Sequence, residues 1–233
     1  MQNIAIITGA NRGLGAAIFN DLFNNKHFDK VISISRNVSK FQKELIADRN
    51  ERFLLITADL SKLSSSDLIK PLEQFESEIK SVTFINNAGV IHPIGKIGEL
   101  NEEELVKAIQ VNVLAPTVIS NFIVKVFKDS KIQIINVTSG AANKSIDGWS
   151  IYGSSKAYME SFINALGIQE KSNSNIVVTN VDPGLVDTDM QMDIRNVKVN
   201  GFTQQNDFVS FKMEGKLATP AVAAKKIIQK INS

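Results

Sequence analysis

Short apolar runs alternate along this chain with longer segments in which apolar residues recur at helical spacing. Between the first two runs, Leu14, Ile18 and Leu22 predict a helix, and Phe41 with Leu45 predicts another after the second run. Near-continuous apolar strands separated by helices are typical of a parallel sheet covered on both faces. The sequence therefore predicts one doubly wound α/β domain of Rossmann type, with three layers, over residues 1–233. The predicted strands cover residues 4–7, 31–35, 53–57, 82–86, 132–137 and 176–181.

Two later segments depart from this alternation. The longest helical stretch, residues 102–127, contains Pro116, which removes a backbone donor and should bend the helix or be accommodated by it. The segment of about residues 187–216 is more polar and irregular and follows the sixth strand. We expect it to lie on the substrate side of the fold.

Composition narrows the range of functions. The chain has 233 residues, 43% of them hydrophobic, and a formal net charge of +2 that is spread along its length. A small-molecule partner is therefore expected, with no nucleic acid, and no His, Asp and Glu cluster has metal-ligand spacing. The absence of cysteine excludes disulfides and a thiol nucleophile. No export signal precedes the first strand, and no apolar stretch approaches the roughly 20 residues that cross a membrane, so a cytoplasmic protein is expected.

A glycine-rich turn follows the first predicted strand, with the sequence Thr8-Gly9-Ala10-Asn11-Arg12-Gly13-Leu14-Gly15. A helix is expected to open on the last glycine. Such glycines let the backbone approach a pyrophosphate, and the first N–H groups of the helix stabilise its charge. The spacing is G-x-x-x-G-x-G, and a turn that needs glycine only for steric reasons would look the same. The turn favours a dinucleotide site.

The end of the second predicted strand bears on the choice of cofactor. An NAD-selective protein places an acid there for the ribose hydroxyls, but this chain has Arg36. Arg36 and Arg12 can pair with a 2′-phosphate, which favours NADP(H), although a solvated surface arginine would fit the same place. Asp59, after the third strand, can accept from an adenine amino group or can cap a helix.

Tyr152 and Lys156 lie four residues apart on one predicted helix, so their side chains share a face. Ser139 stands just past the fifth strand, at the edge where open α/β sheets bind ligands. A carbonyl that accepts hydride gains negative charge on oxygen, which must be stabilised and then protonated. A phenol could protonate this oxygen, and a nearby ammonium would lower the pKa of that phenol. The tyrosine and lysine alone are a weak signal, because any amphipathic helix can carry such a pair.

Further motifs accompany this set: Asn86-Asn87-Ala88-Gly89, Asn112, and Pro183-Gly184 followed by Val186-Asp187-Thr188. Together they resemble the short-chain dehydrogenase/reductase family over residues 4–231. The resemblance implies that Tyr152 is the general acid, that Ser139 polarises the carbonyl, and that Lys156 lowers the pKa of Tyr152 and holds the nicotinamide ribose. It implies that Asn112 binds a water that relays protons; a buried amide bonded to its own helix is the alternative. The implied cofactor-binding residues are Gly9, Asn11, Arg12, Gly13, Leu14, Gly15, Arg36, Asp59, Leu60, Asn87, Ala88, Gly89, Tyr152, Lys156, Pro183, Gly184, Val186 and Thr188.

Within that family, the stretches 139–142, 148–149 and 186–191 are most similar to benzil reductases that form (S)-benzoin, which themselves resemble sepiapterin reductase. The similarity implies NADPH-dependent reduction of an aromatic diketone or another bulky α-dicarbonyl. A pocket for such a substrate needs aromatic surface around a few polar groups. The expected substrate contacts are Ser139, Trp149, Tyr152 and Met190, with Phe202, Phe208, Phe211 and Met213 as further candidates. Each of the apolar side chains in this set could equally be ordinary core.

Two other functions stay open. One is an NAD(P)-dependent alcohol or sugar dehydrogenase, against which Arg36 counts. The other is a non-catalytic NADPH-binding regulatory protein, which has no need of Tyr152. Family members usually add a strand after the last helix, whereas this chain stops at Ser233, so the sixth strand is expected at the sheet edge. A homodimer through the long helices that contain Asn112 and Tyr152 is expected.

Overall fold

Six parallel strands form one sheet, and their order in space differs from their order in the chain. The computed structural model describes residues 1–62, 70–72, 79–172 and 175–231. The sheet order is β3-β2-β1-β4-β5-β6, so the chain runs outward from β1 to β3 and then returns to place β4 beside β1. This reversal leaves a crevice at the carboxyl ends of β1 and β4. All six predicted strands are confirmed: β1 (Gln2–Thr8), β2 (Lys30–Ser35), β3 (Phe53–Thr57), β4 (Ile79–Asn86), β5 (Lys131–Val137) and β6 (Ile176–Val181).

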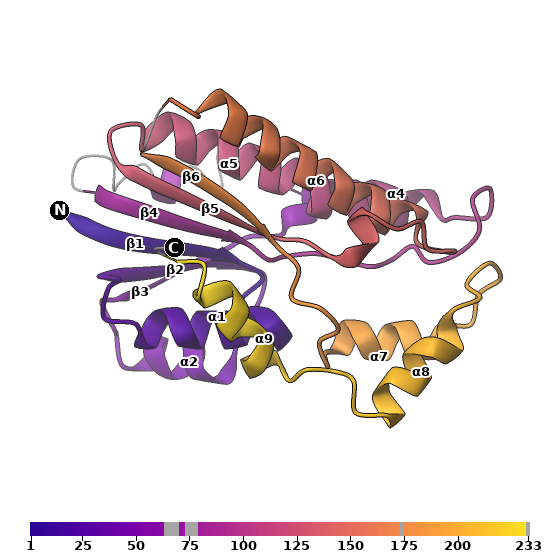
Figure 1. The fold of residues 1–233 in the computed structure, drawn as a ribbon. Helices are drawn as coiled ribbons and strands as arrows, with labels where there is room; N and C mark the ends of the chain where they lie inside the picture. The colour runs from indigo at the N-terminus through magenta and orange to yellow at the C-terminus, as the bar shows by residue number, and fades with distance from the viewer. Residues whose placement is uncertain (63–69, 73–78, 173–174, 232–233) are drawn as a thin grey trace.

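Helices cover both faces of the sheet, as Figure 1 shows. One core packs Phe84 and Ile134 of the strands against Met159, and the other packs Ile7 against Phe19 and Ile227. The predicted doubly wound, three-layer fold is therefore confirmed, and β6 lies at an edge of the sheet as expected. On one face lie α1 (Gly13–Asn24), α2 (Lys40–Ala47) and α9 (Pro220–Ile228), and on the other lie α4 (Glu102–Ile109), α5 (Ala115–Val126) and α6 (Ser150–Gln169).

The long helical stretch continues past Pro116 with a change in its winding. Between α4 and α5, residues Gln110–Leu114 form one wider turn of π-helix, and Pro116 lies in the first turn of α5. A proline ring would crowd the carbonyl four residues earlier in a regular α-helix, and that carbonyl belongs to Asn112. The wider turn therefore accommodates the proline. It also places Asn112 at a distortion of the kind that is frequent at functional sites.

The same helical run comes nearest, among the described residues, to the requirements for a membrane span. By length and composition alone Glu102–Val126 could cross a bilayer, because it has 25 residues and contains an 18-residue window with a mean hydropathy of 1.4. The apolar window is 44% buried inside the protein. Its apolar residues include Ile119 and Ile123, which belong to the core against the sheet. A core helix passes the same test, which makes it weak support for a membrane span.

The segment after β6 was expected to be irregular, and this is wrong. It contains two short helices, α7 (Asp189–Asn196) and α8 (Gln205–Met213), which lie beyond the carboxyl ends of the strands in Figure 1. Helices of eight and nine residues show too few repeats for a helical period to stand out. Phe208 and Ile194 pack with Trp149 in a third, smaller apolar cluster that also contains Tyr152. The segment thus covers the open end of the sheet.

Candidate active site

Helix α6 and the end of β5 bring three predicted catalytic side chains together. Tyr152 and Lys156 are both buried on one face of α6, and the Lys156 ammonium lies 5.8 Å from the centre of the Tyr152 ring. Lys156 Nζ donates to the carbonyl of Val137, the last residue of β5, at 2.8 Å. Ser139 follows two residues later, and its hydroxyl lies close enough to Tyr152 to affect the pKa of the phenol. A phenol, a hydroxyl and an ammonium therefore meet at the carboxyl edge of the sheet.

Burial shifts the pKa values of both titratable groups. It raises the pKa of Tyr152 from 10.0 to about 12; the Ser139 hydroxyl opposes this rise and Asp182 adds to it. The lowered pKa that was expected from the neighbouring Lys156 is therefore not found in the ligand-free protein, because burial of the phenol outweighs it. Burial lowers the pKa of Lys156 from 10.5 to about 8, while the carboxylates of Asp182 and Glu160 act in the opposite direction. At pH 7 the phenol is protonated and the ammonium is charged. A protonated phenol can donate to an oxygen that gains negative charge, so this state suits reduction of a carbonyl.

Asn112 uses its side chain to hold the loop after β4. Its Oδ1 accepts from Val90 N at 2.9 Å, and its Nδ2 donates to Val90 O at 2.8 Å and to Ser155 Oγ at 3.2 Å. Its bonds thus go to other elements and not to its own helix. The Ser155 hydroxyl in turn donates to the Tyr152 carbonyl at 2.8 Å. A Cβ on Gly89 would lie 3.5 Å from Asn112 Oδ1 and 3.8 Å from Lys156 Nζ, so Asn112 and Lys156 flank this glycine.

The glycine turn packs against the loop after β4. A Cβ on Gly15 would lie 2.1 Å from the Gly9 carbonyl, so only glycine fits there. Asn87 Nδ2 donates to the carbonyls of Thr8 and Gly9 at 3.0 and 3.3 Å, and Thr8 Oγ1 accepts from the backbone of Asn87. Helix α1 begins at Gly13, two residues earlier than expected, because Arg12 is extended and acts as its N-cap residue. The turn therefore has a fixed shape at the switch point of the sheet.

The two arginines predicted for a 2′-phosphate lie in different contacts. Arg36 is exposed just after β2. The pKa of Asp59 is lowered mainly by a hydrogen bond from the Ser61 backbone, and the Ser61 hydroxyl and the charge of Arg36 act in the same direction. Asp59 Oδ1 accepts from Ser61 N at 3.0 Å, so the capping alternative is present. Arg12 Nη1 instead pairs with Asp189 Oδ2 at 2.8 Å, across the cleft at the start of α7. Of the two, Arg36 lines the cleft and forms no ion pair among the described residues.

One cavity of about 610 Å³ connects these groups. It begins near Arg36 and Asp59, passes the glycine turn, and continues along Ser139 and Tyr152. All eighteen residues predicted to bind the cofactor line it, whereas Asn112 is buried behind Val90. Among the described residues, no group of three or more His, Cys, Asp or Glu side chains is arranged to hold a metal ion.

The far end of the cavity is largely apolar. Of the predicted pocket residues, Trp149, Met190, Phe208 and Phe211 line it. The Trp149 ring lies 5.5 Å from Tyr152 and 5.2 Å from Phe208, centre to centre. Phe202 stacks on Trp149 at 5.9 Å and is buried as core support. Met213, the last residue of α8, is 83% exposed and does not belong to the wall formed by the described residues.

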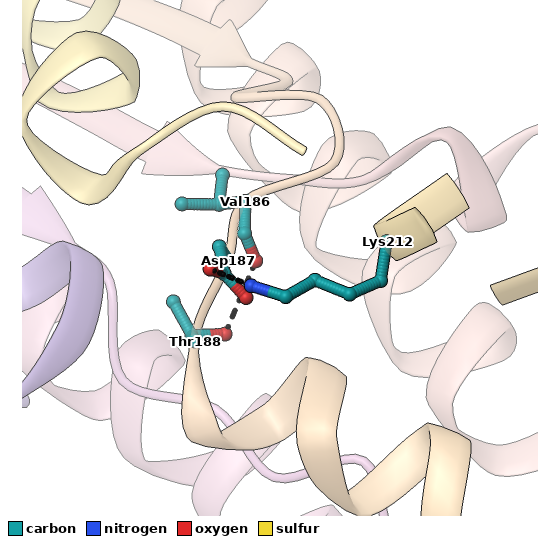
Figure 2. Close-up of polar contacts among 4 residues, drawn as sticks. All are labelled: Val186, Asp187, Thr188 and Lys212. Carbon is teal, nitrogen blue, oxygen red and sulfur yellow. Dashed lines mark hydrogen bonds and ion pairs between the residues drawn. The ribbon is translucent and has the colours of Figure 1, made fainter. Parts of the chain in front are cut away.

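Two polar contacts hold the connection from β6 to α7, which lies on the cofactor side of the cleft. Figure 2 shows Lys212 of α8 reaching the carboxylate of Asp187, at 2.5 Å, beside Thr188. The Thr188 hydroxyl donates to the Val186 carbonyl at 3.4 Å, and a Cβ on Gly13 would lie 3.3 Å from the Thr188 methyl group. The connection from β6 to α7 thus lies against the glycine turn and is held there by α8.

Sequence reasoning missed several polar residues around this set. Ser155 links Asn112 to Tyr152, and Asp182 and Glu160 act on the charge of Lys156. Glu160 follows Lys156 by four residues, a spacing that could have indicated a shared helix face. Asp182 follows β6 directly and reaches the site through the pairing of Val137 with Val181, which no local pattern reveals.

Comparison with known proteins adds to this geometry. A family model described as short chain dehydrogenase matches residues 3–198, which include the glycine turn, Ser139, Tyr152 and Lys156. The chain belongs to the short-chain dehydrogenase family. The resemblance expected from the motifs is thereby confirmed, and the protein is an oxidoreductase of that family.

Individual members of the short-chain dehydrogenase family are similar over nearly the whole chain. The benzil reductase ((S)-benzoin forming) of Bacillus cereus is 31% identical over 230 residues, which cover 95% of this chain and 91% of that protein. The benzil reductase ((S)-benzoin forming) of Bacillus subtilis is also 31% identical, over 94% of this chain and 89% of that protein. The crystal structure of the KRED1-Pglu enzyme has a TM-score of 0.81 at 29% identity, covering 95% of this chain and 91% of that one.

Proposed function

We propose that this oxidoreductase reduces carbonyl groups with hydride from NADPH, and that its substrates are aromatic or α-dicarbonyl ketones similar to benzil. One observation carries the proposal: a single cavity joins Arg36 and the glycine turn to Ser139, Tyr152 and Lys156, and then to the apolar wall around Trp149. A cofactor and a ketone in that cavity would therefore meet at the phenol and the ammonium.

The first half of the cavity fits NADP(H). Gly13 and Leu14 open α1 toward the cavity, so the N-terminal amides and dipole of the helix suit a pyrophosphate. Arg36 presents a planar, permanently charged group that suits a 2′-phosphate. Lys156 would hold the ribose hydroxyls and Thr188 the nicotinamide amide or pyrophosphate. When bound, NADPH supplies the hydride that reduces the carbonyl carbon.

The residues of this chain act on the oxygen of that carbonyl. The hydroxyls of Ser139 and Tyr152 bind it and stabilise the negative charge that it gains. Tyr152, which is protonated at pH 7, then donates its proton from Oη. The ammonium of Lys156, which lies 5.8 Å from the centre of the Tyr152 ring, would stabilise the phenolate that is left. Asn112, which flanks Gly89 together with Lys156, would hold the water that returns a proton to the site.

The apolar end of the cavity supports a bulky, flat substrate. Trp149, Phe208 and Phe211 offer aromatic surface next to Tyr152, with Met190 beside them. Aromatic rings gain both apolar burial and favourable edge contacts in such surroundings. The two Bacillus relatives are named as benzil reductases, and the present chain matches about nine-tenths of each.

The test is the initial rate of NADPH oxidation with benzil, a panel of aromatic and aliphatic α-diketones, and a pterin ketone. We expect benzil-like diketones to be reduced faster than an aliphatic ketone of similar polarity, and NADPH to be used in preference to NADH. Tight NADPH binding without reduction of any carbonyl would instead favour the non-catalytic regulatory function. Oxidation of alcohols or sugars without carbonyl reduction would favour a dehydrogenase.

Arg36→Ala tests the choice of cofactor. We expect the kcat/KM for NADPH to fall about 10–100-fold, because charged hydrogen bonds contribute about 1.5–3 kcal/mol, while the value for NADH stays unchanged. Steady-state kinetics with each cofactor measures this. Arg12→Ala is the matched comparison and should have a smaller effect, because Arg12 pairs with Asp189. An equal loss with both cofactors in Arg36→Ala would contradict a role in 2′-phosphate recognition.

A further inference from the structure

Glu160 bonds to both ends of the loop that carries Ser139. This loop, residues 138–143, is called the Ser139 loop below. Thr138 Oγ1 donates to Glu160 Oε1 at 2.6 Å, and Asn143 Nδ2 donates to Glu160 Oε2 at 3.2 Å. Thr138 directly precedes Ser139, and Asn143 follows the short helix η3 (Gly140–Ala142). The two oxygens of one carboxylate therefore hold the two ends of the loop against α6.

We propose that Glu160 is a positioning residue for the reaction, because its carboxylate clamps the Ser139 loop to the helix that carries Tyr152 and Lys156. The inference rests on the proposed function, in which the hydroxyls of Ser139 and Tyr152 bind the same carbonyl oxygen. Two hydroxyls on different elements can share one oxygen only if those elements keep a fixed separation. Glu160 supplies a direct side-chain link between them.

The rest of the contact explains why such a clamp is needed. The loop approaches α6 closely at Gly153, where a Cβ would lie 3.0 Å from the Ala141 carbonyl. That approach is a contact without a side-chain bond, and the Ser139 hydroxyl itself accepts from Ala141 N within the loop at 3.2 Å. Catalytic groups must be held within about 0.5 Å of their productive geometry. The Glu160 bonds hold both flanks of the loop itself to α6, in addition to the Lys156 bond to the Val137 carbonyl just before the loop.

The clamp is separable from the charge of Glu160. Both Glu160 and Asp182 favour the charged form of Lys156, so removal of the carboxylate would also alter that lysine. Glu160→Gln removes the charge but keeps an acceptor for Thr138, and the exposed Asn143 side chain can rotate to accept from the new amide. Thr138→Val does the reverse, because it removes one bond of the clamp and leaves the carboxylate in place.

Asn164 provides a matched control one turn further along α6. Its Oδ1 accepts from Asn180 Nδ2 at 3.0 Å, so it ties the same helix to β6 and not to the Ser139 loop. Asn164→Ala therefore removes a side-chain bond between α6 and the sheet without touching the Ser139 loop. It should lower thermal stability and leave kcat unchanged.

The experiment compares the wild type with Glu160→Ala, Glu160→Gln, Thr138→Val and Asn164→Ala. We expect Glu160→Ala to lower kcat about 10–100-fold with the KM for NADPH unchanged, because small misplacements of catalytic groups cost up to about 10²-fold. Glu160→Gln should recover most of the rate, and Thr138→Val should lie between them. The clamp is overturned if Glu160→Ala is no slower than Asn164→Ala. It is also overturned if Glu160→Gln is as slow as Glu160→Ala while Thr138→Val is fast, since charge would then be the cause.

Hydrogen exchange separates failure of the clamp from failure of the proposed function. The amides of Ala142 and Asn143 donate to Ser139 O and Gly140 O at 2.9 and 3.3 Å, so the loop has protected amides that can report on its docking. We expect their exchange to speed up in Glu160→Ala and Thr138→Val but not in Asn164→Ala. If the wild type reduces no carbonyl, the proposed function fails, and the exchange measurements still show whether Glu160 holds the loop. Unchanged exchange in both clamp variants would overturn the inference.

Discussion

Tyr152→Phe should lower the rate of carbonyl reduction by about 10²–10⁴-fold, the range that positioned proton donors contribute. The substitution removes one hydroxyl and keeps the ring that packs against Trp149 at 5.5 Å, so folding and cofactor binding should be unchanged. Ser139 would still bind the carbonyl oxygen but could not protonate it as a buried phenol does. Stopped-flow or steady-state oxidation of NADPH measures the rate, and titration of NADPH fluorescence measures binding.

The chain offers one matched control for this substitution. Its only other tyrosine is Tyr158, on the same helix, where it is 45% exposed and stacks on Phe162. Tyr158→Phe should keep full activity. If Tyr152→Phe retained more than about a tenth of the wild-type rate, the loss would be smaller than general acid catalysis contributes. Tyr152 would then not be the proton donor.

The fold could be predicted because its central strands are buried on both faces. Ile4, Ile6 and Ile7 have no solvent exposure, so an uninterrupted apolar run indicates β1 as clearly as an alternation of apolar and polar residues would. The helices α7 and α8 could not be predicted in this way. Their buried residues, such as Ile194 and Phe208, pack on Trp149 from a distant part of the chain, and each helix spans too few turns for a period to appear.

In the candidate site, too, the residues that share a local pattern could be predicted, and the contacts between distant parts of the chain could not. Tyr152 and Lys156 were predicted because four-residue spacing on a helix places both on one face, and the structure brings them to Ser139. The pairing of Arg12 with Asp189 joins residues 177 positions apart, and no local pattern predicts such a contact. The clamp at Glu160 likewise depends on where the loop after β5 meets α6.

The homodimer and the cytoplasmic location stay predictions, because a single chain tests neither.

Lys156 connects the function of the site to the stability of the fold. Burial lowers its pKa from 10.5 to about 8, so the unfolded chain binds more protons than the folded chain between these values. The resulting penalty on folding is fully present below about pH 8, and it disappears as the pH rises toward the ordinary lysine pKa. At about 1.4 kcal/mol for each pH unit, the penalty at pH 7 amounts to about 3 kcal/mol.

Lys156→Met should therefore stabilise the ligand-free protein at pH 7 by about 1–2 kcal/mol, after the loss of the hydrogen bond to the Val137 carbonyl is subtracted. The same substitution should lower the rate of carbonyl reduction by at least about 10²-fold, because the phenolate of Tyr152 loses its counter-charge. Urea unfolding of both proteins at pH 7 and pH 10 measures the difference in the free energy of unfolding. The advantage of the variant should shrink at pH 10, where the buried lysine of the wild type is neutral. If the extra stability of the variant did not change with pH, it would come from packing alone. If the variant were less stable than the wild type at pH 7, the bond to Val137 would outweigh the cost of burying the charge.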